Sequence, residues 1–277
     1  MPYVLMVGCG DVATRSALQL IEAGWHVTGL RRHTENLPRP IQPLAADLQQ
    51  ANLPNGWPAH IDYLVYAVAA TQHDEAGYRA AYINGLHNTL NWLAEQGQQP
   101  KRIVFLSSTG VYGQDQHEWV DEDSPTEPNG FTGQVLLEAE QLLAASGHPF
   151  TCLRFAGLYH PDRTWMQDQV RAGWLPDAQP VMYSNRLHRD DAAALLTRVL
   201  MAAEAGQPVA TCYIGVDDEP APLHDVVQWL RQQLGVTHTT DNSTRRRAGS
   251  KRCSNARAKT LGWQPQYPSY REGYLTR

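Results

Sequence analysis

The sequence predicts an α/β fold, a doubly wound parallel sheet with a smaller C-terminal lobe. Short apolar segments alternate with segments of helical periodicity from the first residues onward. The glycines Gly8 and Gly10 separate the first apolar segment from the first helical one. Past Tyr159 the alternation loosens, with tryptophans and prolines interspersed, which indicates a second and smaller unit.

Composition limits the classes of function. The chain has 277 residues, 42% of them hydrophobic, and a net charge of −5, so we expect no nucleic-acid partner and no membrane surface. No apolar run approaches the roughly 20 residues that span a bilayer, and the first residues do not resemble a signal peptide, so we expect a cytoplasmic protein. The four cysteines lie far apart, which predicts neither a metal site nor a disulfide framework.

The first strand, turn and helix have the order that a dinucleotide pyrophosphate site requires. Residues 4–7 are the expected strand and residues 13–21 the expected helix. Gly8 permits the turn, Gly10 lets the backbone approach the phosphates, and Ala13 lets the helix pack closely on the strand. Asp11, read as a helix cap, and Val12 complete the predicted phosphate-binding turn, whose free N–H groups face the anion. A plain turn between buried elements is the alternative.

The second strand distinguishes between cofactors. Residues 26–30 form the expected strand, and Arg31 and Arg32 follow it. A cofactor with a free ribose diol would favour an acidic residue there, whereas arginine suits a 2′-phosphate. The sequence therefore predicts NADP(H), with NAD as the alternative, and disfavours the S-adenosylmethionine of a methyltransferase. Two solvent-exposed arginines are the reading without a ligand.

Three further strand ends belong to the predicted ligand-binding edge. Residues 41–44 precede Asp47 and Leu48, where the aspartate would meet adenine or cap a helix. The strand predicted over residues 63–70 ends in small residues, and the strand predicted over residues 102–109 ends in three hydroxyls. These hydroxyls would face a ligand or bond to local backbone. The residues assigned to the cofactor from these strands are Asp47, Leu48, Ala67, Val68, Ala69 and Ser107.

With these motifs in order, the chain resembles the extended short-chain dehydrogenase/reductase superfamily, of the NAD-dependent epimerase/dehydratase type. The matching segments span nearly the whole chain and are residues 107–113, 122–128, 153–159, 187–191 and 261–265. The resemblance implies a Rossmann domain over residues 1–155 and a substrate lobe over residues 156–277. Within the lobe, residues 185–216 would return to pack on the Rossmann sheet.

The helix predicted over residues 129–145 departs from that superfamily. Active members carry a Tyr-x-x-x-Lys pair there, and aligning Glu140 with the superfamily's glutamate places Thr132 and Leu136 at the two positions. Neither residue can replace an activated tyrosine and its lysine. The chain thus resembles the atypical branch that lacks the pair. Ser108 stays at the hydroxyl position, and the residues proposed for catalysis are Ser108, Thr132 and Tyr112, with Tyr159 as a further proton donor.

The C-terminal third offers fewer signals. We expect helices over residues 192–203 and 223–234 and a strand over residues 212–216. Arg154 and Arg163 would meet an anionic ligand or lie in solvent, and His188 is read as an anchor of the lobe or a functional histidine. The basic run at residues 244–247, with Lys251 and Arg252, forms a solvated loop or a phosphate-binding lid.

Together these observations predict an NAD(P)-binding oxidoreductase or epimerase-like protein, acting on an unknown small molecule such as a sugar nucleotide or another carbonyl or hydroxyl compound. A non-catalytic NADP(H)-binding sensor or regulatory protein is the alternative. The resemblance also implies a homodimer formed through the helices at residues 74–96 and 129–145.

Overall fold

The computed structural model describes residues 1–162, 164–243 and 249–274. Seven parallel strands form one sheet in the order β11-β7-β5-β4-β1-β2-β3. Their bounds are Tyr3–Val7 (β1), His26–Arg31 (β2), Gln42–Ala45 (β3), Tyr63–Tyr66 (β4), Arg102–Ser108 (β5), Phe150–Phe155 (β7) and Cys212–Gly215 (β11). The strand order reverses between β1 and β4, and open α/β sheets bind ligands at the carboxyl edge of such a reversal.

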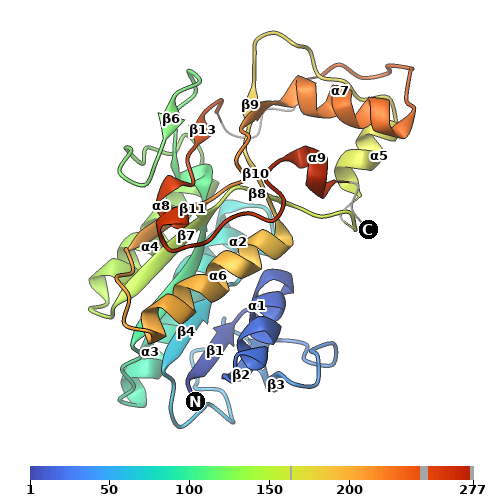
Figure 1. Cartoon of the computed structure of the whole chain (residues 1–277). Helices are drawn as coiled ribbons and strands as arrows, with labels where there is room; N and C mark the ends of the chain where they lie inside the picture. The colour runs from blue at the N-terminus through green and yellow to red at the C-terminus, as the bar shows by residue number, and fades with distance from the viewer. Residues whose placement is uncertain (163, 244–248, 275–277) are drawn as a thin grey trace.

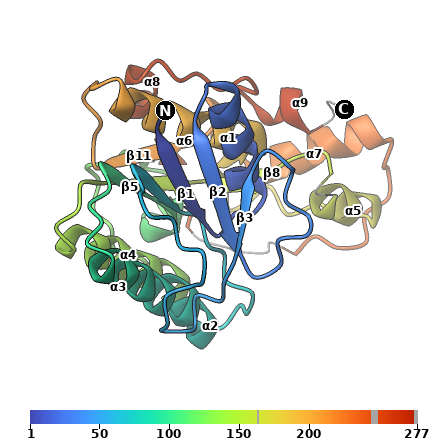
Figure 2. The ribbon, with the colours of Figure 1, turned by 90° about the horizontal axis from the view of Figure 1, so that it is seen from below.

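Helices cover both faces of the sheet, which confirms the predicted fold class (Figures 1 and 2). One face carries α1 (Asp11–Glu22) and α6 (Arg189–Glu204). The other carries α2 (Glu75–Arg79), the π-helix η1 (Ala80–Asn84), α3 (Gly85–Glu95) and α4 (Phe131–Ala145). Figure 2 shows the sheet between these two layers.

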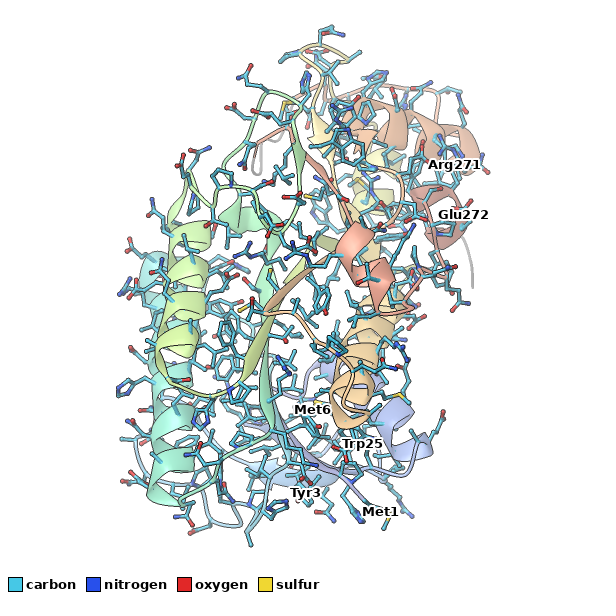
Figure 3. All side chains as sticks on the ribbon, turned by 60° about the vertical axis from the view of Figure 1, so that its left-hand side comes forward. Met1, Tyr3, Met6, Trp25, Arg271 and Glu272 are labelled. Carbon is cyan, nitrogen blue, oxygen red and sulfur yellow. The ribbon has the colours of Figure 1, made fainter. Side chains whose placement is uncertain are left out.

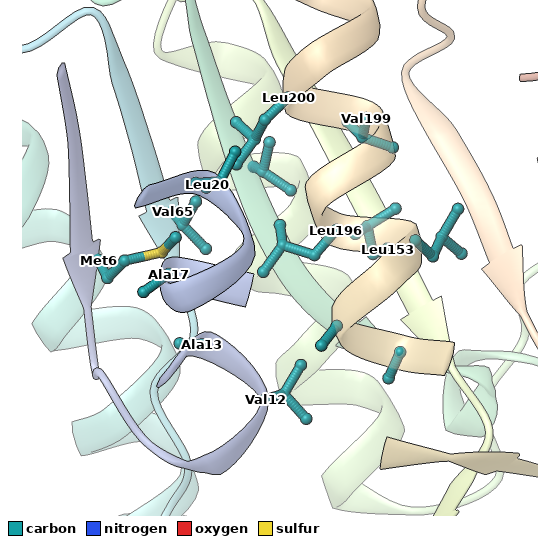
Figure 4. Close-up of a cluster of buried hydrophobic side chains, with 14 of the residues drawn as sticks. Met6, Val12, Ala13, Ala17, Leu20, Val65, Leu153, Leu196, Val199 and Leu200 are labelled. Atoms are coloured by element: carbon teal, nitrogen blue, oxygen red, sulfur yellow. The ribbon is translucent and has the colours of Figure 1, made fainter. Parts of the chain in front are cut away.

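The first core lies between the sheet, α1 and α6 (Figure 4). Ala13 and Ala17 are small, so α1 packs closely on β1. Where the two helices meet, the hydroxyls of Ser16 and Thr197 share a buried hydrogen bond of 2.8 Å. Larger side chains fill the rest of the core, including Met6, Leu20, Val65, Leu153, Leu196, Val199 and Leu200.

The second core lies on the opposite face of the sheet, under α3 and α4. Leucines of the two helices pack against apolar side chains of the central strands. They are Leu86, Leu93, Leu136 and Leu143 from the helices, against Leu5, Val7, Leu64, Ile103 and Phe105 from the strands. Because both faces of the sheet are covered, the central strands read as continuous apolar runs.

The C-terminal lobe has a core of its own around Val170, Trp174, Val226 and Leu230. Its helices are α5 (Trp165–Arg171), α7 (Leu223–Leu234) and α9 (Tyr270–Gly273). Three short strand pairs join it to the sheet edge: β8 (Gly157–Tyr159) with β10 (Arg186–His188), β9 (Tyr183–Ser184) with β12 (Ala221–Pro222), and β6 (Trp119–Val120) with β13 (Arg252–Cys253). The short helices η2 (Thr109–Val111) and α8 (Ala256–Thr260) complete the chain. Figure 3 shows Arg271 and Glu272 of α9 at the end of the molecule opposite Met1 and Tyr3.

Two predicted elements differ from the structure. The strand expected over residues 63–70 ends at Tyr66, and residues 67–70 are a loop at the carboxyl edge. The single helix expected over residues 74–96 is divided by η1, where the hydroxyl of Tyr66 donates to the carbonyl oxygen of Ala81 at 2.5 Å. A side chain that captures a backbone carbonyl accompanies the wider turn, which periodicity does not reveal.

Other predicted elements hold. Helix α7 coincides with residues 223–234, α1 and α6 contain the helices expected over residues 13–21 and 192–203, and β11 contains most of the strand expected over residues 212–216. The predictions for Arg163 and for the basic run at residues 244–247 lie outside the described residues. In the described part of the chain, no helix has both the length and the apolar character needed to cross a membrane.

Candidate cofactor and active site

The turn after β1 brings the chain to the point where the strand order reverses. Gly8 has φ +81°, and a Cβ on it would lie 2.7 Å from the backbone of Val68. A glycine is therefore required there for the turn and for the approach of the loop after β4. A Cβ on Gly10 would meet nothing closer than the carbonyl oxygen of Gly8, at 3.8 Å. The space in front of Gly10 is open, as a pyrophosphate site needs.

A cleft of about 460 Å³ opens over this turn, a volume within the usual range for ligand sites. Most of the residues predicted to hold the cofactor line it: Gly8, Gly10, Arg31, Arg32, Asp47, Leu48, Ala67, Val68 and Ala69. Helix α1 begins directly beside it, with Gly10 as an N-cap that offers no side-chain hydrogen bond. The first N–H groups of α1 therefore lack a side-chain cap at the cleft.

The two arginines differ in their surroundings. Arg31 is half-buried, and its Nη1 donates to the carbonyl oxygen of Cys9 at 3.3 Å. Arg32 is exposed at the rim of the cleft. Asp47, on the loop after β3, accepts the backbone N–H of Gln49 at 3.0 Å, so this carboxylate is oriented by its own loop. A dinucleotide lying across the turn would meet both cationic side chains on one side.

Four predicted cofactor residues lie outside the cleft lining. Val12 and Ala13 are buried in the first core, and Ser107 is buried on β5. Asp11 is not the cap of α1, because that position belongs to Gly10. It is the first helical residue, and its carboxylate pairs with Arg15 at 3.1 Å and Arg189 at 2.9 Å. These two pairs partly neutralise a charge that would otherwise repel a pyrophosphate.

Two of the sequence motifs meet in a buried polar network between β5, β7 and α4. Arg154 and Glu140 form an ion pair of 2.6 Å, with both side chains less than a tenth exposed. Ser107 donates to Glu140 at 2.6 Å, and Arg154 donates to the hydroxyl of Tyr112 at 2.7 Å. The anionic partner of Arg154 is thus inside the protein. Tyr112 is 1% exposed, and burial raises the pKa of its hydroxyl well above the usual range despite Arg154.

The residues proposed for catalysis do not form a proton relay. The hydroxyl of Ser108 accepts the backbone N–H of Gly110 at 3.0 Å and stays partly exposed at the end of β5. Thr132 is exposed on the first turn of α4, while Leu136, one turn later, is 6% exposed and packs in the second core. Tyr159 is 5% exposed and donates to the carbonyl oxygen of Ser269 at 3.2 Å.

Sequence reasoning missed the wall of the cleft that α2 and η1 supply. Gly77, Ala80 and Ala81 line it together with Gln72. Gly77, Ala80 and Ala81 are small, so a planar group could lie against this wall. The sequence signal for this wall is the glycine and the alanines within an otherwise amphipathic helix, which the apolar periodicity alone does not single out.

Comparisons with known proteins agree with this geometry. A family model described as NAD(P)H-binding matches residues 8–203. The structure of a candidate NAD-dependent epimerase/dehydratase from Methylobacillus flagellatus is 36% identical, with 99% of this chain and 96% of that chain aligned and a TM-score of 0.81. UDP-glucose 4-epimerase from Thermotoga maritima shares the fold at 18% identity, with 99% and 96% aligned and a TM-score of 0.79.

Curated relatives match over shorter stretches. A 3-diazoavenalumate denitrifying reductase from Streptomyces is 29% identical over 186 residues, which are 56% of this chain and 57% of the reductase. Protein YeeZ from Escherichia coli K12 is 35% identical over 113 residues, or 40% of this chain and 39% of that protein. The matches therefore span from two fifths to little more than half of these relatives. With the family model and the Methylobacillus structure together, the chain belongs to the NAD(P)H-binding family, with the fold of the extended short-chain dehydrogenases/reductases.

Proposed function

We propose that the protein is an NADPH-dependent reductase whose substrate accepts a hydride without a proton from an enzyme side chain. One contrast carries the proposal. The cofactor cleft is open, with Arg31 and Arg32 along one wall. Helix α4, in contrast, presents Thr132 and the buried Leu136 where the superfamily's Tyr-Lys pair would stand. The chain thus retains a binding site and lacks the usual acid.

The preference for NADPH rests on the two arginines. Arg31 ends β2 and Arg32 follows it, where a 2′-phosphate of the adenosine ribose would lie in this fold. Each charge-assisted contact contributes about 1.5–3 kcal/mol, so even one of them favours NADPH over NADH by at least about tenfold. Asp47 and Leu48, on the same side of the cleft, would hold the adenine.

The substrate class follows from the missing relay. A bound nicotinamide supplies the hydride. Reduction of a carbonyl also needs a proton at the oxygen, and the hydroxyls of Ser108 and Thr132 are too weakly acidic to donate it efficiently. They can orient a substrate or a water molecule. An acceptor that is already cationic, such as an iminium or a diazonium group, gives a neutral product without that proton. The name of the Streptomyces relative points to a diazo compound as its substrate.

Cofactor binding is tested by calorimetry with NADPH and NADH. The wild-type protein should bind NADPH at least about tenfold more tightly. The double variant Arg31→Ala, Arg32→Ala should lose that preference, whereas Arg39→Ala, an exposed arginine outside the cleft, should retain it. Equal affinity of the wild-type protein for both cofactors would overturn the assignment.

The substrate class is tested by NADPH oxidation. A cyclic iminium ion and the ketone of the same ring should differ by at least about 100-fold in kcat/KM, because only the ketone needs the missing acid. Ser108→Ala should raise KM for the iminium more than it lowers kcat, since this hydroxyl orients the substrate. Reduction of the ketone at an equal rate would contradict the proposal.

An NADP(H)-binding sensor is the second candidate. It is favoured because the hydroxyls of Tyr112 and Tyr159 are both bonded inside the protein. A sensor should bind NADPH and oxidise it with neither the iminium nor the ketone, and NADPH should alter its protection from a protease. We also infer a cytoplasmic location and a homodimer formed through residues 74–96 and α4; size-exclusion chromatography with light scattering would detect the dimer.

A further inference from the structure

The loop after β3, residues 46–51, forms one border of the cofactor cleft and is held by α3 from outside the cleft. It contributes to the cleft lining through Ala46, Asp47, Leu48 and Gln49. The loop belongs to no strand or helix, so its position depends on what its backbone binds. We propose that Asn88 is a positioning residue for the cofactor, because its side chain fixes this loop in the shape that the adenosine half needs. The inference rests on the cofactor assignment made under the proposed function.

Three carbonyl oxygens of the loop accept hydrogen bonds from side chains of α3. The Nδ2 of Asn88 donates to the carbonyl oxygen of Leu48 at 2.8 Å and to that of Gln50 at 3.4 Å. One turn later, Nε1 of Trp92 donates to the carbonyl oxygen of Ala51 at 2.8 Å. Trp92 is fully buried and anchors the far end of the loop. The half-buried Asn88 holds the part that lines the cleft.

The loop's own hydrogen bonds shape it without attaching it to the fold. The backbone N–H of Gln49 donates to the carboxylate of Asp47 at 3.0 Å, and that of Gln50 donates to the carbonyl oxygen of Asp47 at 3.0 Å. Both bonds lie within the turn, so the turn could tilt as a unit. In the described part of the chain, the amide of Asn88 is the group outside the loop that forms hydrogen bonds with residues 47–50.

A close approach of α3 lets so short a side chain reach the loop. Gly85, the first residue of α3, is buried, and a Cβ on it would lie 3.3 Å from the Cβ of Leu48 and 2.5 Å from the hydroxyl of Tyr66. A larger residue there would push the helix away from the loop. The same hydroxyl of Tyr66 donates to the carbonyl oxygen of Ala81, which lies in the opposite wall of the cleft. The start of α3 is therefore braced against both borders.

Fixing the loop in advance raises the affinity for the cofactor. When the binding shape of a site is populated only part of the time, the affinity falls in proportion to that fraction. Without the amide of Asn88, the loop would have to be ordered at the moment of binding, which costs free energy. The glycine turn and the two arginines lie at the ends of β1 and β2. We therefore expect the loss in the adenosine contacts of Asp47 and Leu48.

Calorimetry with NADPH and with adenosine 2′,5′-bisphosphate tests the proposal on the full-length protein. Asn88→Asp keeps the shape of the side chain and puts carboxylate oxygens against two carbonyl oxygens, and Asn88→Ala removes the donors without adding charge. Both variants should bind each ligand about tenfold more weakly than the wild-type protein, as a loop in its binding shape about a tenth of the time would. Asn91→Asp is the matched control. It adds the same charge to the exposed face of α3, where Asn91 contacts His87 at 3.1 Å, and should bind both ligands normally.

The equal loss for the two ligands separates positioning of the loop from general damage. A disturbed cleft would weaken NADPH more than the bisphosphate, which lacks the nicotinamide half, and that result would overturn the proposal. Hydrogen exchange of the free protein gives a second measurement, independent of any ligand. Residues 46–51 should exchange faster in both Asn88 variants than in the wild-type protein and in Asn91→Asp, with unchanged circular dichroism.

Unchanged affinity or unchanged exchange in the Asn88 variants overturns the role of Asn88. If the wild-type protein binds NADPH in that case, the cofactor assignment still stands. A wild-type protein that binds neither ligand overturns both the assignment and the inference.

Discussion

Two regions at the carboxyl edge, the glycine turn and the first turns of α4, differ in how open they are. Around the turn, Gly8 is held by its φ of +81° and by its closeness to Val68, and a cleft stands open in front of Gly10. On α4 the exposed Thr132 is followed by Leu136, which is part of the second core. The first region is open, and the second is packed.

The difference shows that part of a sequence motif can serve the packing of the fold. Glu140 of α4 still matches the superfamily pattern, and it does so as the partner of Arg154 and Ser107 inside the protein. Removing one member of so deeply buried an ion pair leaves the other charge without a partner and strongly destabilises the fold. Leu136 lies one turn earlier on the same helix, where its side chain packs in the second core.

The largest expected effect is on folding. Glu140→Ala leaves the guanidinium of Arg154 buried without its carboxylate, which should lower the free energy of unfolding by about 3–5 kcal/mol in urea denaturation. Glu138→Ala is the control. Glu138 lies on the surface of α4 and pairs with Arg79 of α2, so this variant should leave the unfolding midpoint unchanged. A loss below about 1 kcal/mol for Glu140→Ala would contradict a structural role for this network.

The glycine turn should respond in binding and leave folding intact. Gly10→Val places a branched side chain in the open space that the phosphates need, so NADPH affinity should fall at least about 100-fold, or 2.7 kcal/mol. The melting temperature should stay near that of the wild-type protein, because no atom lies within 3.8 Å of the new Cβ. Gly130→Val, at an equally open position before α4, should bind NADPH normally. Normal binding by Gly10→Val would show that the phosphates lie elsewhere.

Restoring the relay tests the other side of the comparison. The wild-type protein should oxidise NADPH negligibly with ketones, aldehydes and sugar nucleotides. Thr132→Tyr, Leu136→Lys should raise ketone reduction by about 10²-fold or more, within the usual range for general acid–base catalysis. Thr132→Phe, Leu136→Met has similar shapes without the acid and should not. Rapid turnover by the wild-type protein that survives Ser108→Ala and Thr132→Val would refute the loss of the relay.

A smaller effect, on the pH dependence of stability, is expected for a buried carboxyl that is less fully bonded than Glu140. Asp217 is 1% exposed, one of its oxygens has no partner among the described residues, and burial raises its pKa to about 8. Because the folded protein favours the protonated form, the penalty for burying Asp217 is absent below about pH 4 and grows up to about pH 8. Asp217→Asn should therefore gain stability over the wild-type protein more at pH 8 than at pH 5.

Urea unfolding midpoints at the two pH values measure this difference. Asp218→Asn is the matched control, because its side chain is 36% exposed and pairs with Lys259. Its difference from the wild-type protein should not follow the same trend. A constant gap between Asp217→Asn and the wild-type protein would mean that Asp217 is ionised in the fold throughout.

Local patterns in the sequence sufficed for the elements and for the cofactor class. The glycine turn, the arginines at the end of β2 and the apolar strands depend on neighbours within a few residues, because turns, strand ends and helix caps are set by short-range sterics and hydrogen bonds. They predicted the doubly wound fold and NAD(P) binding, which the structure and the family match bear out. The assignment of Thr132 and Leu136 to the superfamily's Tyr and Lys positions came from the resemblance and stays a prediction.

Long-range packing decided the remaining features. The pairing of Arg154 with Glu140, the division of a predicted helix by η1, and the meeting of His160 with His188 depend on segments brought together by folding. Periodicity carries no information on which polar side chain another will meet across the core. The sequence by itself therefore determined the fold class and the cofactor turn. Only the tertiary structure decided which charged and hydroxyl groups line the cleft and which bond to partners inside the protein, since that depends on burial and on partners distant in the chain.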